Sequence, residues 1–132
     1  MFAFFPERGS LMDHLPPVPR PQWRRIQLAR YLIDYRKHPL ERMRFDDDGA
    51  LIDFGLPQGE IDAVIAAGTV FRTSGCPGKE ADDVSACDRP YGDSPPSDIA
   101  SYPFKLNRRD IRKARRQLDA GMRDTGAPAG NR

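Results

Sequence analysis

The sequence predicts an α/β chain, because short apolar runs with strand character alternate with stretches of helical periodicity. The run MFAFF favours a buried strand, and TVFRTSG near the middle of the chain has the same character. Apolar residues at helical spacing predict helices over residues 23–38, 60–67 and 107–120. We therefore expect strands and helices to follow one another through the first part of the chain.

The composition limits the size of any core. The chain has 132 residues, of which 39% are apolar, 30% are charged, 13 are proline and 11 are glycine. This share of proline and glycine is above the usual one, so we expect many turns and a modest core. No window approaches the roughly 18 apolar residues of a membrane span. Two cysteines do not make a disulfide scaffold, so a cytoplasmic location is expected.

Charge is distributed unevenly along the chain. Residues 1–40 carry seven Lys or Arg and three Asp or Glu, and residues 99–132 carry nine and three. Residues 41–98 carry five Lys or Arg and thirteen Asp or Glu. An acidic middle between basic ends indicates either ends that fold back on the middle or a basic end that meets an acidic partner.

The first helix follows a proline-rich linker that contains Pro16, Pro17, Pro19 and Pro21. Its apolar residues form two sides, which favours contact with more than one neighbour. These sides are Ile26, Ala29 and Ile33, and Leu28, Leu32 and Tyr35. Asp48–Gly49 then predicts a tight hairpin turn. The aspartates beside this turn are consecutive, unlike the alternating ligands of a calcium loop.

The last helix is basic and has recognisable ends. Asn107 with Asp110 predicts an N-terminal cap, Gly121 predicts its end, and residues 121–132 are expected to form a disordered tail. Ile111, Ala114 and Leu118 form a narrow apolar stripe on this helix. Six cations can neutralise phosphates, or can dock on the acidic middle of the chain. They are Arg108, Arg109, Arg112, Lys113, Arg115 and Arg116.

The histidines and cysteines do not form a metal motif. His14 and His38 stand apart from any cysteine or aspartate at metal-ligand spacing. Cys76 and Cys87 supply at most half of a closed zinc or iron–sulfur site, which needs about four ligands. Free thiols in a polar loop, a disulfide, and a metal site shared with another chain all remain open at this point.

The order of elements resembles the late part of the barrel in radical S-adenosylmethionine enzymes of the biotin-synthase-like group. In that family a strand ends in a P-x-x-G-[ST]-x-[LM] turn, and a helix of the R-x-I-x-x-A-R-x-L kind follows. The tail TSGCPG…CDRPYGD…SYPF is similar to a C-terminal tail of some members. The matching residues are Pro6, Gly9, Ser10 and Leu11, then Arg24 or Arg25, Ile26, Ala29, Arg30 and Leu32.

The resemblance implies a partial (β/α) barrel over residues 1–75, a cysteine-containing tail over 76–106 and the basic helix over 107–120. It also implies a cofactor site at Gly9 and Ser10, at the mouth of the barrel. Substrate contacts are implied at Arg72, Thr73, Ser74, Arg89 and Tyr91, because the two arginines can hold a carboxylate or phosphate. Cys76 and Cys87 are the implied metal ligands, and the cofactors are S-adenosylmethionine and an iron–sulfur cluster.

Two departures from the family limit what this chain can do by itself. The cluster motif C-x-x-x-C-x-x-C and the first half of the barrel are absent, and KEADDVSA separates cysteines that stand close in the family. The chain is therefore expected to be a C-terminal fragment or split subunit that is inactive alone. A second chain that completes the barrel, or a homodimer, is expected. The alternative is a small protein that binds nucleic acid or an acidic partner through residues 108–118, with no membrane involved.

Overall fold

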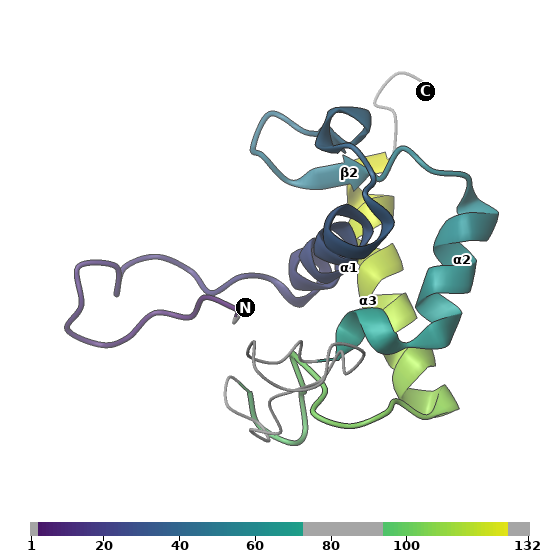
Figure 1. Ribbon diagram of the computed structural model, residues 1–132. Coiled ribbons are helices and arrows are strands. Elements are labelled where there is room, and N and C mark those ends of the chain that lie inside the picture. Colours follow the sequence, from purple (N-terminus) through teal and green to yellow (C-terminus); the bar gives the residue numbers. More distant parts are fainter. Residues whose placement is uncertain (1–2, 73–93, 127–132) are drawn as a thin grey trace.

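In the part of the chain that the structure describes, three helices surround a small core and one short hairpin lies against them (Figure 1). The computed structural model describes residues 3–72 and 94–126, with side chains placed as far as residue 120. The elements in chain order are α1 (Arg20–Arg36), the 3-10 turn η1 (Leu40–Arg42), β1 (Arg44–Phe45), β2 (Leu51–Asp53), α2 (Gln58–Ala67), the 3-10 turn η2 (Thr69–Phe71) and α3 (Arg108–Gly126).

Helix α1 begins inside the proline run instead of after it. Pro21 lies in the first turn, where a missing N–H leaves no helical hydrogen bond unmade. The helix ends at Lys37, which adopts the left-handed conformation with φ of 53° and donates its N–H to the Leu32 carbonyl. The helix predicted over 23–38 is confirmed, and both of its ends lie two or three residues earlier.

The hairpin predicted around Asp48–Gly49 is confirmed. Strands β1 and β2 pair antiparallel, and the side chain of Asp46 closes the turn by accepting the N–H groups of Asp48 at 3.0 Å and Ala50 at 2.8 Å. Arg25 of α1 is buried and donates to the Leu51 carbonyl at 2.6 Å. This hydrogen bond ties the hairpin to α1.

The end of α2 and the start of α3 lie where the sequence predicts them, but the end of α3 does not. Helix α2 ends at Ala67, as predicted, and Gly68 after it adopts the left-handed conformation. At the start of α3, the Asn107 N–H donates to the Asp110 carboxylate at 3.1 Å, and the Asp110 N–H donates to the Asn107 side chain at 2.9 Å. The prediction that Gly121 ends this helix is wrong, because the helix continues to Gly126. A single glycine costs a helix only about 1 kcal/mol.

The core forms where α1 meets α3, α2 and the turn η2. Leu28 and Leu32 of α1 are buried there, and Ala114 and Leu118 cover them from α3. Phe71 of η2 is fully buried in the same cluster. Of the predicted side Leu28, Leu32 and Tyr35, the two leucines pack in the centre but Tyr35 is exposed. Ile26, Ala29 and Ile33 of the other side are only partly buried.

Residues 94–106, here called the strap, lie against the first half of α1 and lead to α3. The indole N–H of Trp23 and the side-chain amide of Gln27 both donate to the Ala100 carbonyl, at 3.1 and 3.0 Å. Arg20 forms an ion pair of 3.0 Å with Asp98, and its hydrogen bond holds the pKa of that carboxyl below the usual 3.8. These contacts fasten an irregular segment to the first half of α1.

The predicted partial (β/α) barrel is wrong for the described residues. They contain one antiparallel pair of strands, with no parallel strand pair of the kind a barrel needs beyond an isolated bridge between Arg72 and Tyr102. The run MFAFF was expected as a strand, but its described residues, 3–5, carry no regular structure, and TVF is the 3-10 turn η2. The physical reason is that a strand needs hydrogen-bonding partners on its edges, and the described residues provide no neighbouring strand for either run.

Candidate functional site

The sequence-predicted cofactor and substrate residues fall in separate parts of the structure. Gly9 and Ser10 lie in the turns of residues 8–15, within residues 3–19, here called the N-terminal arm, which projects away from the helices (Figure 1). Arg72 follows η2 in the body of the protein, where its backbone forms the isolated bridge with Tyr102. Gly9 and Ser10 are exposed, whereas Arg72 is partly buried.

The remaining predicted residues lie outside the described residues. These are Thr73, Ser74, Cys76, Cys87, Arg89 and Tyr91. Among the residues that are described, no group of three His, Cys, Asp or Glu side chains could hold a metal ion. The expected metal and substrate roles of these six residues therefore stay predictions.

The tip of the N-terminal arm has a defined turn structure. The Gly9 N–H donates to the Asp13 carboxylate at 3.1 Å, and the Ser10 N–H donates to the Glu7 carbonyl at 3.1 Å. Gly9 has φ of +85°, a conformation that side chains other than glycine rarely adopt. The base of the arm is closed by a hydrogen bond of 3.1 Å from the Val18 N–H to the Phe4 carbonyl.

The N-terminal arm displays an unusual amount of apolar side chain. Leu11 is 96% exposed and Phe5 is 61% exposed, and Met12 and Leu15 are exposed beside them. Contiguous exposed apolar residues commonly mark a surface that another polypeptide covers. Within the described residues the arm has turn structure of its own, but its large side chains lack apolar cover.

Helix α3 carries a basic face. Arg108, Arg109, Arg112 and Arg116 are all exposed and lie within an arc of about 100° around the helix, at 3.6 residues per turn. Lys105, also exposed, immediately precedes the helix. No acidic side chain within the described residues forms an ion pair with these five cations. We call them the basic face.

Two other cations of the same helix have structural partners. Arg115 forms ion pairs with Asp62 of α2 at 2.7 Å and with Asp119 at 3.2 Å. A hydrogen bond from Gln58 and the Arg115 charge hold the pKa of Asp62 below its usual 3.8. Lys113 donates to the Ser97 carbonyl at 3.2 Å. An ion pair between the basic C-terminal part and the acidic middle is thus present, from Arg115 to Asp62.

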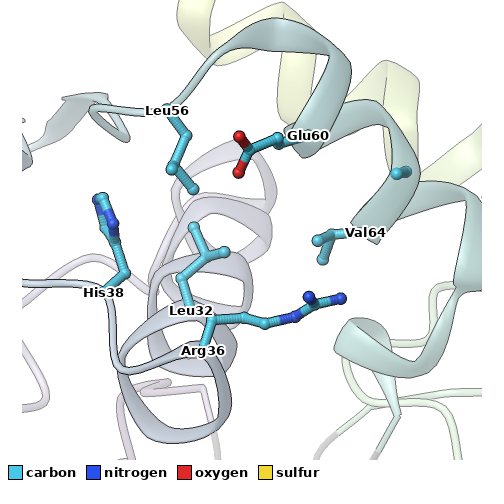
Figure 2. A pocket seen from close by; sticks show the side chains of 7 residues that line it. Leu32, Arg36, His38, Leu56, Glu60 and Val64 are labelled. Carbon is cyan, nitrogen blue, oxygen red and sulfur yellow. The ribbon is translucent and has the colours of Figure 1, made fainter.

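A pocket of about 300 Å³ opens between α1 and α2 (Figure 2). Its apolar walls are Leu32, Leu56, Ala63 and Val64, and its charged residues are Arg36 at the end of α1 and Glu60 in the first turn of α2. His38 closes one side, with Leu32 between it and the Arg36 guanidinium in the view of Figure 2. The pocket therefore combines an apolar floor with one cation and one anion.

His38 is held in a fixed orientation. It is 7% exposed, and its Nε2 lies 2.7 Å from the Phe54 carbonyl. Because a carbonyl can only accept, Nε2 carries the hydrogen in this contact. The imidazole is therefore a rigid wall of the pocket, positioned by the residue that follows β2.

Sequence reasoning missed this pocket because its polar residues are far apart in the chain. Arg36 and His38 come from the end of α1, and Glu60 follows more than twenty positions later. His38 was expected to be a solitary residue at a helix end, and no local motif links it to Glu60. Only the packing of α1 against the segment from Phe54 to α2 brings these groups to one opening.

Comparisons with protein-family models, with curated proteins and with solved structures each gave no match for this chain. Across the residues that the structure describes, none of the helices has both the length and the apolar character required to cross a membrane.

Proposed function

We propose that this chain is a segment of a radical S-adenosylmethionine enzyme that works only with a second polypeptide. The observation that carries the proposal is the N-terminal arm, which projects away from the helices (Figure 1) and contains the resembling residues Pro6, Gly9, Ser10 and Leu11, of which the last three are exposed. Gly9, at the motif position, has the positive φ that favours glycine. The exposed Leu11 and Phe5 provide apolar surface for the second polypeptide.

The second polypeptide must supply most of the chemistry in this proposal. The chain has two cysteines, so it lacks the three thiolates of C-x-x-x-C-x-x-C that hold the cluster in this family. It also contributes no barrel strand from its described residues. Its contribution would be the arm, with Gly9 and Ser10 beside a cofactor held by the partner. A cytoplasmic location fits, because a reducing compartment keeps cysteines as thiols.

The test is co-expression with the polypeptide encoded directly upstream. A stable complex is expected by size-exclusion chromatography with light scattering, and anaerobic iron and sulfide should give a cluster spectrum and reductive cleavage of S-adenosylmethionine in the complex alone. Leu11→Arg should weaken the complex by at least about tenfold, because it places a charge in an apolar contact. Leu11 makes almost no contact in the described fold, so the variant should keep its circular dichroism spectrum.

Leu40→Arg is the matched control, because Leu40 is also exposed but lies on η1 at the far end of α1. It should leave the complex intact. The proposal is wrong if the chain alone acquires the cluster. It is equally wrong if two results are found together. The chain alone would be a monomer that unfolds cooperatively, and Leu11→Arg would bind the upstream polypeptide as tightly as the unmodified chain does.

A second candidate function, binding of nucleic acid, is favoured by the basic face. Four arginines project from about 12 Å of helix, at a rise of 1.5 Å per residue, without an acidic partner among the described residues. Free cations on one face are suited to phosphate oxygens, and affinity for nucleic acid then falls with salt. Two acidic residues, Asp110 and Asp119, occur among the cations of this helix. Asp110 caps the helix and Asp119 pairs with Arg115, so neither neutralises the basic face.

Fluorescence anisotropy with a labelled single-stranded oligonucleotide tests this second function. Four phosphate contacts predict a slope of log affinity against log salt of about −3, at about −0.7 per contact. Arg112→Glu with Arg116→Glu should reduce that slope by about 1.4 and lower the affinity at least tenfold. Arg115 is left unchanged, because its replacement would also break the contact with Asp62.

Lys37→Glu with Arg42→Glu is the control for the same change in charge, since both residues are exposed and neither belongs to α3 or to the basic face. This variant should change the affinity only slightly. Equal losses in the two double variants would mean that net charge, and not the basic face, determines binding. Tighter binding to polyglutamate than to the oligonucleotide would assign the face to an acidic protein partner instead.

A further inference from the structure

We propose that the pocket between α1 and α2 binds a small zwitterion of the α-amino acid class, with its carboxylate on Arg36, its ammonium on Glu60 and its apolar side chain on the leucines. The pocket is independent of the N-terminal arm and of the basic face. It is built from Leu32, Arg36, His38, Leu56, Glu60, Ala63 and Val64.

The charges at the pocket are available to a ligand. Arg36 and Glu60 are both exposed, and they form no ion pair with each other or with another described residue. They come from different helices and both line the pocket, with the Arg36 guanidinium on the side of Val64 and the Glu60 carboxylate on the side of Leu56 in Figure 2. A ligand that carries both charges can satisfy both groups at once, whereas a simple anion or a simple cation would leave one of them facing a like charge.

The size and lining of the pocket limit the ligand further. A volume of about 300 Å³ is at the lower end of the range for small-molecule sites. Leu32, Leu56 and Val64 present aliphatic surface, and the His38 ring closes the side away from the Arg36 guanidinium. An aliphatic side chain of four carbons can cover these apolar residues, while glycine would leave them exposed to water.

The two histidines of the chain provide a direct readout. His38 lines the pocket, and His14 lies in the N-terminal arm. Titration with L-leucine, followed by the imidazole proton and carbon resonances, should shift the His38 signals and leave those of His14 unchanged. A ligand of this size is expected to bind with a Kd of about 1 mM.

Analogues of leucine and variants of the chain test each assigned contact. N-acetyl-leucine lacks the ammonium and leucine amide lacks the carboxylate, so each should bind at least about tenfold more weakly than leucine. Glu60→Gln and Arg36→Gln should produce the same loss for leucine. Both residues are exposed, so the substitutions should leave the unfolding midpoint unchanged.

The matched controls are Glu41→Gln and Arg42→Gln, which remove the same charges from exposed positions on η1. They should bind leucine like the unmodified chain. The proposal is overturned if His38 does not respond to leucine up to about ten times the expected Kd, or if glycine binds as well as leucine. It is also overturned if the Arg36 and Glu60 variants bind as the controls do.

Discussion

Arg24→Ala is expected to lower the free energy of unfolding by about 4 kcal/mol, because several buried hydrogen bonds end on this one guanidinium. Arg24 is 0% exposed. Its Nη1 donates to the Ala100 carbonyl at 2.6 Å and to the Gln27 side chain at 2.8 Å, and its Nη2 donates to the Ile99 carbonyl at 2.6 Å. Its Nε donates to Gln117 of α3 at 2.9 Å.

The Arg24 guanidinium also lies over two aromatic rings. Its central carbon is 5.5 Å from the ring centres of both Phe71 and Tyr102, within the range of a cation–π contact. One side chain of α1 therefore joins η2, the strap and α3. With alanine in its place the backbone carbonyls of the strap lose charged donors, and a cavity replaces the guanidinium. Most small domains have only 5–15 kcal/mol of stability, so the loss is large.

Urea denaturation followed by circular dichroism measures this effect. The unfolding midpoint of Arg24→Lys should fall between those of the unmodified chain and of Arg24→Ala. An ammonium keeps the charge but lacks the planar fork that reaches several acceptors. Arg30→Ala is the control on the same helix, since Arg30 forms a surface ion pair of 3.2 Å with Asp34 and lies over the exposed Tyr35 ring at 5.9 Å, without buried acceptors. It should cost less than about 1 kcal/mol. Equal unfolding midpoints for Arg24→Ala and Arg30→Ala would contradict the central role of Arg24.

The elements that the sequence predicted well are those with local signals. The hairpin follows from Asp48–Gly49, the end of α2 from Gly68, and the start of α3 from Asn107 with Asp110. Each signal acts through backbone conformation or a hydrogen bond within a few residues. Such features form whatever the rest of the chain does, so a single sequence is enough to locate them.

The barrel could not be predicted from the same information, because strand character says nothing about the presence of a partner strand. The run TVF has suitable residues for a strand, yet Val70 and Phe71 are buried in a 3-10 turn. The burial of Arg24 could not be predicted from the sequence either, since charged residues in a helix normally face water. Its neutral carbonyl partners belong to residues more than seventy positions away.

The pocket illustrates a further limit of sequence reasoning. His38, Arg36 and Glu60 are ordinary residues in their local contexts, and neither their spacing nor their neighbours predict a site. Their combination depends on how α2 is placed on α1, which in turn depends on the turn at Gly55. A short connection with a demanding conformation therefore determines the geometry of a surface several residues away.

Gly55→Ala is expected to lower the free energy of unfolding by about 3 kcal/mol, because the turn between β2 and α2 has no room for a methyl group. Gly55 has φ of +69°, which is strained for alanine. A Cβ atom on Gly55 would lie 2.8 Å from the carbonyl carbon of Arg42 and closer still to its oxygen. Both Arg42 atoms are backbone, so relief requires that η1 moves away from the turn.

Gly59→Ala is the matched control, because it makes the same chemical change four residues later in α2. A Cβ atom there would have no neighbour within 4 Å, and the backbone does not need glycine. It should raise the free energy of unfolding by up to about 1 kcal/mol, the helix preference of alanine over glycine. Opposite shifts of the urea midpoint are therefore expected for the two variants. A Gly55→Ala chain that unfolds at the unmodified midpoint would mean that the turn and η1 are not packed as described.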